Sequence, residues 1–237
     1  MAENRFRISK GRWLLILGIL LVVVDQVIKL LVKSNMTLGE HFSVFGNWFQ
    51  ILFIENEGMA FGMKFGGMVG KFVLTAFRVV LFGFLCWWIT RLVRRGRPAE
   101  IDADGKILKY APVPTGVLVG LTLITAGALG NIVDCLLYGQ IFSASTPYEV
   151  AQFGGSYAPV MFGKVVDMFY FPLIDTTWPT WMPFIGGHPF RFFEPVFNFA
   201  DSCVTVGAFY LVLFQYKFFT AERRKNRVFR RKRSRIM

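Results

Sequence analysis

The sequence is poor in the residues on which most hydrolytic and metal chemistry depends. Its 237 residues include two histidines, His41 and His188, and three cysteines. It contains neither a His-Glu-x-x-His zinc motif nor a Gly-x-Ser-x-Gly turn around a nucleophilic serine. The cysteines are odd in number, lie inside apolar runs and lack metal-ligand spacing, so we expect neither a disulfide framework nor a metal site. These cysteines are Cys86, Cys135 and Cys203.

Charge is scarce as well, and acidic charge is the scarcer kind. Only 18% of the residues are charged, 54% are hydrophobic and 17% are aromatic, and the mean hydropathy is +0.47. The 27 basic residues outnumber the 15 acidic ones, which gives a formal net charge of +12. No internal repeat is evident. This composition is typical of a protein that crosses a membrane several times and not of a soluble domain.

Four apolar runs are long enough to cross a bilayer, which takes about 20 helical residues. They cover about residues 13–32, 71–90, 115–137 and 196–218. The first run follows basic residues, as a signal peptide would. However, Asp25, Gln26 and Lys29 lie near its end, and no small-residue cleavage site follows. We therefore predict a retained first helix, and for residues 1–237 a single α-helical membrane domain with four transmembrane helices and no cofactor.

The basic residues predict the orientation of this domain. They gather at the N-terminus, in the loop at 91–109 and in the tail at 219–237. Because cytoplasmic loops carry the excess of Lys and Arg, both termini are expected in the cytoplasm, and segments 35–69 and 138–195 outside it. The basic tail could suggest nucleic acid, but attraction to anionic lipid at the cytoplasmic face explains it more simply, so we expect no nucleic-acid partner.

The two outer segments carry strand signals. A mixture of aromatic and β-branched residues runs from Phe45 to Phe53 beside a Gly46-Asn47 turn signal, and a second strand-like piece covers 163–169. We expect a small β-rich platform at the outer face. The Trp-, Pro- and Phe-rich stretch at 171–195 suits the lipid headgroup region, as a lid or as a rest on the membrane.

Polar residues from separate segments are expected at one depth, near the outer face. Asn198 and Asp201 lie three apart at the start of the last run, so they share a helix face that Thr205 continues. Asn131 and Asp134 have the same spacing at the far end of the third run. An acid within a membrane helix is by default a candidate functional residue.

Two carboxylates held close together favour aspartyl protease chemistry. They cannot both ionise easily and tend to share a proton, so one can take a proton from water while the other donates to the substrate carbonyl. Such a pair titrates as a unit.

Simpler roles fit each of these residues too. Asp201 could be an ordinary helix cap, and Asp167 a loop carboxylate that faces water. Asn131 and Asp134 could tie helices together by hydrogen bonds. Asp25 and Lys29, four apart on one helix, favour a structural pair that neutralises itself.

Two classes of protein other than a protease remain open. A small proton-coupled carrier or a lipid-binding membrane protein could use the same acids as a relay. A carrier would place them near the bilayer midplane and often show internal symmetry, whereas these acids are expected at the outer face. A membrane scaffold with structural polar ties would leave a pairing of Asp167 with Asp201 unexplained.

Taken in order, the polar motifs resemble those of the bacterial lipoprotein signal peptidases (signal peptidase II). The matching pieces are Asp25-Gln26-x-x-Lys29, Asn56-x-Gly58-x-Ala60-Phe61, Gly127-x-x-Gly130-Asn131-x-x-Asp134, Val165-Val166-Asp167 and Phe197-Asn198-x-Ala200-Asp201. Each piece alone is weakly specific, but their order and the expected topology together cover most of the chain.

The resemblance implies an aspartyl endopeptidase without a metal. Such enzymes remove signal peptides from prolipoproteins, cutting before a cysteine that already carries diacylglycerol, and globomycin-type cyclic peptides inhibit them. The resemblance places the catalytic pair on Asp167 and Asp201. The positions that it implies as substrate-binding or site-supporting are Asn56, Gly58, Asn131, Asp134, Asn198 and Ala200.

The chain departs from the family pattern at two places. Cys135 follows Asp134 where the family usually has an arginine, so Asp134 has no adjacent cation in the sequence. The outer loop is also longer, with extra residues at about 143–163 and 174–193. Asp175 is the competing choice for Asp167, but it lacks the preceding Val-Val pair.

Overall fold

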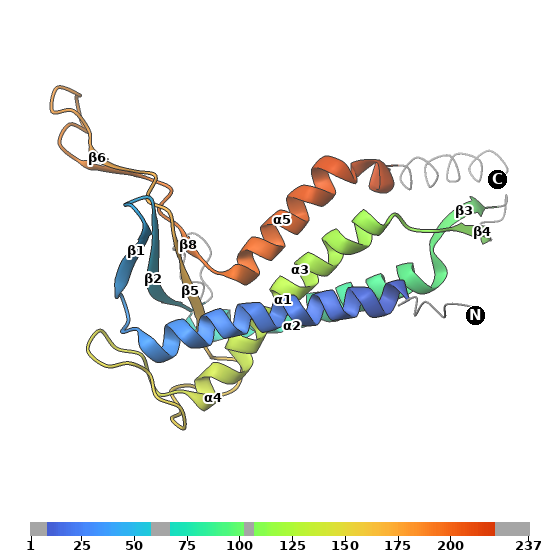
Figure 1. Ribbon diagram of the computed structural model, residues 1–237, viewed down its shortest axis with the longest axis horizontal. Helices are drawn as coiled ribbons and strands as arrows, with labels where there is room; N and C mark the ends of the chain where they lie inside the picture. Colours follow the sequence, from blue (N-terminus) through green and yellow to red (C-terminus); the bar gives the residue numbers. More distant parts are fainter. Residues whose placement is uncertain (1–8, 58–66, 102–106, 221–237) are drawn as a thin grey trace, which may run out of the picture. The chain divides into compact units, whose positions relative to one another are not determined.

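The computed structural model describes residues 9–57, 67–101 and 107–220 of the chain (Figure 1). Its helical elements are α1 (Lys10–Asn35), α2 (Gly67–Arg95), α3 (Thr115–Val133), the π-helical turn η1 (Asp134–Tyr138), α4 (Gly139–Ile141) and α5 (Phe199–Phe214). Its strands are β1 (His41–Phe45), β2 (Phe49–Asn56), β3 (Arg97–Ile101), β4 (Ile107–Ala111), β5 (Val165–Tyr170), β6 (Ile174–Thr177), β7 (Pro189–Phe192) and β8 (Val196–Phe197).

Three helical segments in the described part of the chain are long and apolar enough to cross a membrane. They are Lys10–Asn35, Gly67–Arg95 and Thr115–Ile141, the last of which runs through α3, η1 and α4. Each contains one of the first three predicted spans. The three spans are therefore confirmed as apolar helices of sufficient length.

The fourth predicted span differs from the prediction. The sequence analysis starts it at Val196, but Val196 and Phe197 form strand β8, and helix α5 begins only at Phe199. The predicted start is wrong because these two residues pair with Phe169 and Tyr170 of β5. Helix α5 has 16 residues, and residues 216–220 are helical again after a bend at Gln215.

The chain divides into two compact units, the first built from three separate stretches of sequence and the second from two. Unit 1 contains residues 1–22, 80–129 and 203–237, and unit 2 contains residues 23–79 and 130–202. Four of the helices, α1, α2, α3 and α5, contribute residues to both units.

Unit 2 contains a four-stranded antiparallel sheet in the order β1-β2-β5-β8 (Figure 1). Strands β1 and β2 form a hairpin, and residues 46–48 make the turn at the predicted Gly46-Asn47 signal. Strand β5 pairs with β2, and the register places Asp167 opposite Ile54. Strands near 45–53 and 163–169 are thus confirmed.

One face of this sheet packs into the core of unit 2. Alternate residues of β5, Val166 and Met168, are fully buried on this face, as is Phe53 of β2. Because side chains alternate along a strand, Val165, Asp167 and Phe169 of β5 point to the opposite face. The remaining buried members of the core are Val32, Met36, Tyr138, Phe142 and Ala151.

Unit 1 is a packed arrangement of helix segments. Glycines let α3 and α5 approach closely: a Cβ on Gly120 would lie 2.6 Å from Leu211, and one on Gly207 would lie 2.8 Å from the Gly120 carbonyl oxygen. The buried core residues are Leu14, Leu85, Leu92, Val113, Val117, Leu118, Leu121, Leu211 and Phe218.

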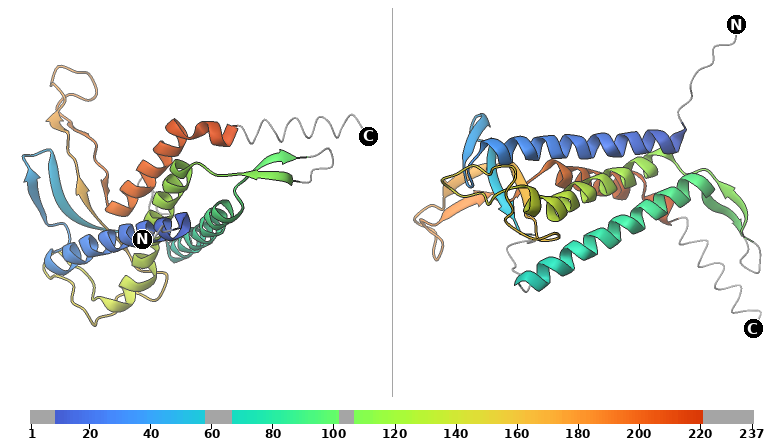
Figure 2. Two further views of the ribbon diagram at one scale, coloured as in Figure 1. Left: turned by 45° about the vertical axis from the view of Figure 1, so that its right-hand side comes forward. Right: turned by 90° about the horizontal axis from the view of Figure 1, so that it is seen from below.

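Two further hairpins have no clear signal in the sequence. Strands β3 and β4 pair within the basic loop at 91–109 and just beyond it. Strands β6 and β7 pair within the aromatic stretch, with Asp175 opposite Arg191. Figures 1 and 2 show the β6–β7 hairpin extending away from the four-stranded sheet of the same unit.

Candidate active site

Asp201 lies in the first turn of α5, where it takes part in a reciprocal cap. The Asn198 side-chain oxygen accepts the Asp201 N–H at 2.9 Å, and the Asp201 carboxylate accepts the Asn198 N–H at 3.4 Å. This is the geometry of a capping box, with Asn and Asp in the places of the usual Ser or Thr and Glu. The predicted i,i+3 pairing is confirmed. Capping and a chemical role are compatible, because only one oxygen of Asp201 is used by the cap.

Asp167 approaches the same cap from strand β5. The Asn198 Nδ2 donates to Asp167 Oδ1 at 2.7 Å. Asn198 itself is fully buried, so its position is fixed from both sides. Asn198 therefore touches both aspartates and brings them to one place. Asp167 is only 3% exposed, so the alternative of a loop carboxylate facing water is wrong.

The surroundings of Asp167 favour its protonated form. Burial, and next the charge of Asp201, raise the pKa of the Asp167 carboxyl from 3.8 to about 7. Hydrogen bonds from Asn56 and Asn198 act in the opposite direction but do not outweigh these effects. At neutral pH the two aspartates can thus hold a proton between them.

Asn131, near the end of α3, contacts the other oxygen of Asp201. Its Nδ2 donates to Asp201 Oδ1 at 2.8 Å. Its Oδ1 accepts from Asn198 Nδ2 at 3.1 Å and from Lys29 Nζ at 2.9 Å. Asn131 is therefore fixed as a donor toward Asp201, because its oxygen is held by two donors.

Lys29 contacts other residues besides Asp25, the partner that its helix spacing predicts. It pairs with Asp25 at 3.0 Å, as the spacing predicts, and also with Asp134 at 2.7 Å. All three side chains are at most 2% exposed. The interpretation of Asp25 and Lys29 as a pair that neutralises itself is therefore incomplete. One buried cation serves two carboxylates and Asn131, which connects the pair to the site.

Asp134 supports the strand that carries Asp167. Its Oδ2 accepts the backbone N–H of Val166 at 3.2 Å, one residue before Asp167, and its Oδ1 accepts from Gln26 at 3.0 Å. Cys135 supplies no adjacent cation, but Lys29 provides one from α1. Arg78 of α2 lies with Nη1 3.5 Å from Cys135 Sγ.

Ala200 acts through its backbone and its small size. Its backbone N–H lies in the first turn of α5, where the helix itself offers no carbonyl acceptor, and it donates to Asp25 Oδ1 at 2.9 Å. A Cβ added to Gly130 would collide with Asp25 and lie 3.1 Å from the Ala200 Cβ. This close approach at Gly130 lets α1 anchor the start of α5.

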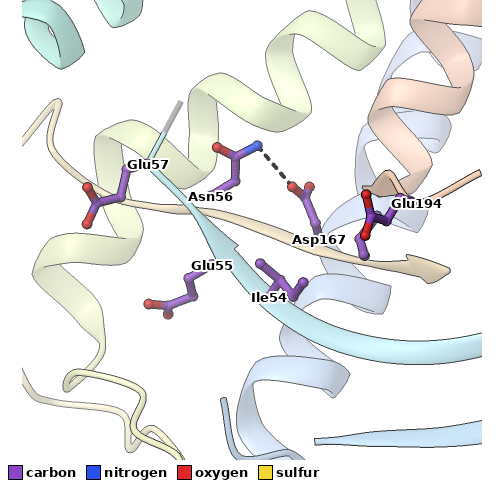
Figure 3. Close-up of a pocket in the computed structure, with 7 residues that line it drawn as sticks. Ile54, Glu55, Asn56, Glu57, Asp167 and Glu194 are labelled. Atoms are coloured by element: carbon purple, nitrogen blue, oxygen red, sulfur yellow. Dashed lines mark hydrogen bonds between the residues drawn. The ribbon is translucent and has the colours of Figure 1, made fainter. Parts of the chain in front are cut away.

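Asn56 closes the group from the end of β2. Its Nδ2 donates to Asp167 Oδ2 at 3.2 Å, as Figure 3 shows. A pocket of about 490 Å³ opens beside these two residues. The lining residues are Ile54, Glu55, Asn56, Glu57, Asp167, Glu194 and Val196. Gly58, also predicted in this segment, lies outside the described residues, and so do Ala60 and Phe61.

The structure adds residues that the motifs do not single out. Glu55 points away from Asp167 (Figure 3) and pairs with Lys33, which is fully buried. Ser145 bonds to both of them, at 2.8 Å each. The alternation of β2 puts Glu55 and Asn56 on opposite faces, which is the one signal the sequence offers for this cluster. Among the residues that the structure describes, no three His, Cys, Asp or Glu side chains are placed to hold a metal ion.

Comparison with known proteins agrees with the motifs. The family described as signal peptidase (SPase) II matches residues 17–217. A lipoprotein signal peptidase of Porphyromonas gingivalis is 44% identical over 216 residues, which cover 90% of this chain and 87% of that protein. One of Amoebophilus asiaticus is 32% identical over 199 residues, covering 83% and 75%. A solved bacterial membrane enzyme aligns at 22% identity with a TM-score of 0.49, over 86% of this chain and 87% of that one.

The family match covers most of the chain, and the described part contains three helices long and apolar enough to cross a membrane. The chain therefore belongs to the signal peptidase II family of bacterial multi-pass membrane peptidases.

Proposed function

We propose that this chain cleaves the signal peptides of prolipoproteins with Asp167 and Asp201 as an aspartic dyad. The observation that carries the proposal is Asn198, which hydrogen-bonds Asp167 through its side chain and caps the helix turn that contains Asp201. The raised pKa of Asp167 fits the carboxyl that holds the shared proton.

In the proposed reaction, a water molecule lies between the two carboxyl groups. The other carboxyl of the pair takes a proton from the water as the water oxygen bonds to the substrate carbonyl carbon. The protonated Asp167 donates to the carbonyl oxygen, which gives a neutral tetrahedral intermediate. Its collapse breaks the C–N bond: the leaving nitrogen takes the proton that came from the water, and one hydroxyl returns its proton to Asp167 as the carbonyl re-forms. The products are a free carboxylic acid and a free amine.

The neighbouring residues would keep this arrangement fixed. Asn131 directs its amide to Asp201, and Asn56 directs its amide to Asp167. Asp134, Lys29 and Asp25 support the elements that carry the dyad, β5 and α5. Gly58 and Ala200 stay predicted site-supporting positions, Ala200 through its backbone. The pocket beside Asp167 would take the peptide that flanks the bond to be cut.

The substrate class follows from the family and the relatives. The matched proteins are named lipoprotein signal peptidases, and the motif resemblance implies a diacylglyceryl-modified prolipoprotein cut before its lipidated cysteine. A dyad at the membrane surface would let the lipid stay in the bilayer while the peptide enters the pocket. Globomycin-type cyclic peptides are the expected inhibitors.

We further propose one membrane domain with four spans in the bacterial inner membrane. The fourth span would be α5, which is shorter than the others because the chain before it is used by β8. The basic N-terminus, second loop and tail support cytoplasmic termini, with anionic lipid around the tail. The dyad and the four-stranded platform would then face outward. The carrier alternative gains no support from the family or the relatives.

The test is cleavage of a purified diacylglyceryl-modified prolipoprotein, followed by its gel mobility. The wild-type chain is expected to convert the substrate, and Asp167→Asn and Asp201→Asn to leave it intact. Asp175→Asn is the matched control, since it changes another aspartate of the outer segment and is expected to keep activity. Loss of cleavage with Asp175→Asn, together with normal cleavage by Asp167→Asn, would assign the dyad to Asp175 and Asp201 instead. No cleavage of several substrates by folded wild type would reject the function.

A further inference from the structure

Unit 2 carries a continuous row of aromatic side chains outside the dyad and the pocket. We name this row the aromatic strip; its members are Phe45, Trp48, Phe49, Phe171, Phe193 and Phe197. The rings are linked without a break: Phe49 stacks on Phe171 with centroids 4.7 Å apart, Phe171 stacks on Phe197 at 5.7 Å, and Phe193 contacts Phe197 edge-on. The strip thus crosses the sheet from β1 to β8.

The strip is only partly covered by protein. Phe45 and Trp48 at one end are 60% and 53% exposed, and Phe193 at the other end is 41% exposed. Exposed aromatic area that is continuous over several strands is unusual for a surface that faces water and marks an interaction site.

The β6–β7 hairpin continues this apolar surface. Trp181 and Phe184 at its tip are 78% and 99% exposed. From Thr176 to Phe190 the hairpin contains no Asp, Glu, Lys or Arg. Phe184 has a φ of 69°, in the left-handed region that is unfavourable for a residue with a Cβ. This backbone conformation costs free energy and exposes the phenyl ring, and contact of the ring with a partner would offset that cost.

We propose that the aromatic strip and the tip of the β6–β7 hairpin (178–188) form one surface that lies in the headgroup layer of the bilayer. Three observations favour lipid as the occupant. The surface is aromatic and contains tryptophan, the side chain that concentrates at membrane interfaces. The tip contains no Asp, Glu, Lys or Arg, so it offers no charge complementary to a charged protein surface or to a nucleic acid. Helix α5, apolar and part of a membrane protein, begins two residues after Phe197.

This last point supplies the continuity with the membrane. The strip includes Phe197 of β8, and Asp201 follows within the first turn of α5. The hairpin returns to the sheet through residues 193–195, so its base is tied to the same helix start. A membrane surface at the beginning of α5 is therefore within reach of both parts. Seating them there would hold Asp167 and Asp201 at a fixed depth relative to the lipid of a substrate.

Depth-dependent quenching of Trp181 fluorescence tests this proposal. The full chain would be reconstituted into phosphatidylcholine vesicles that contain lipid brominated either near the headgroup or near the chain ends. Subtracting the emission of Trp181→Phe from that of the wild type isolates Trp181. We expect the shallow bromine to reduce this emission more than the deep bromine, and aqueous iodide to have little effect. The same subtraction with Trp87→Phe isolates the emission of Trp87, a half-exposed tryptophan of the long apolar helix α2. Trp87 is the control for a tryptophan in contact with lipid.

A charge at the tip provides a second test. Phe184→Asp is expected to move Trp181 from lipid quenching to iodide quenching, because a carboxylate draws the tip into water. Tyr148→Asp, at a 91% exposed position earlier in the same outer segment, is the matched control and is expected to leave Trp181 unchanged. Iodide quenching of Trp181 in the wild type would overturn the proposal. Protection from both quenchers would also overturn it, since that would indicate a lid or a protein partner.

Discussion

The Asn198 amide donates to the Asp167 carboxylate across 2.7 Å, while the Asn198 side-chain oxygen holds the N–H of Asp201. One buried amide thereby joins Asp167 of strand β5 to Asp201 at the start of α5, two residues that are 34 positions apart in sequence. An amide suits this task because it has both donors and an acceptor. A carboxylate in its place would repel both aspartates.

Replacing Asn198 should reduce turnover more than it reduces stability. Asn198→Ala removes the helix cap, at about 1 kcal/mol. It also frees Asp167 from its alignment with Asp201, for which we expect a loss of about 100-fold in kcat. The measurement is kcat alongside detergent-phase thermal unfolding. Asn35→Ala is the matched control, since that exposed asparagine bonds to Leu31 O of its own helix, near the end of α1. A kcat within a few-fold of wild type would contradict the assigned role.

The pH dependence should follow the raised pKa of Asp167. Since its carboxyl holds the proton up to a pKa of about 7, activity should decline above that pH, by about tenfold per unit once the decline is established. The sign for stability is the same: the folded state binds this proton more tightly than the unfolded state. This contribution is present at acid pH and is lost as the pH rises from 3.8 through about 7.

Asn56 should tune that decline. Its hydrogen bond to Asp167 Oδ2 lowers the pKa, so Asn56→Ala should raise the pKa further and move the alkaline decline to higher pH. The profile of kcat/KM against pH measures this shift. Gln50→Ala, on the same strand but bonded to Asn47 O, should leave the profile in place. A shift to lower pH in Asn56→Ala would refute the hydrogen-bond assignment.

The sequence predicts local features of this site better than it predicts the contacts between elements. The spacing of Asn198 and Asp201 predicts a shared helix face, and the structure turns it into a reciprocal cap. Hydropathy places the first three spans, since length and apolarity decide them. The start of the fourth is misplaced, because Val196 and Phe197 are as apolar as a helix but find a partner in β5.

Contacts over long sequence distances are what the pattern leaves out. The pair of Lys29 with Asp134 joins residues 105 apart, and nothing in either local sequence indicates it. The same holds for Lys33 with Glu55 and Ser145. The hairpins β3–β4 and β6–β7 lack alternating patterns, so their pairing depends on backbone hydrogen bonds that a side-chain pattern does not report.

The Lys33 and Glu55 pair offers a test by double substitution. Lys33→Met leaves the buried Glu55 carboxylate with the Ser145 hydroxyl and, among the described residues, with one cation, the partly exposed Lys164 at 3.5 Å. The change should cost about 3–5 kcal/mol of unfolding free energy. Lys33→Met combined with Glu55→Gln removes both charges and should recover part of that loss. Denaturant unfolding in micelles of the two single variants and the double variant gives the coupling. Additive losses would show that the pair does not interact.

Gly130 should not tolerate a side chain. A Cβ there would collide with Asp25 and crowd Ala200, so Gly130→Ala should destabilise the protein by about 1–3 kcal/mol and lower activity. Gly83→Ala is the matched control in helix α2, where a Cβ meets nothing within 4 Å. That change should be neutral or stabilise by up to about 1 kcal/mol. Equal effects of the two changes on unfolding would contradict the close approach at Gly130.

The most direct test of the dyad is the additivity of its two substitutions. Cleavage rates of a diacylglyceryl-modified prolipoprotein would be measured for Asp167→Asn, Asp201→Asn and the double variant, all shown to be folded. If the two carboxyls act as one unit, each single change should remove at least about 1,000-fold of the rate, and the double variant should be no slower than either. Losses that multiply in the double variant, or a single variant that keeps near wild-type activity, would contradict the dyad.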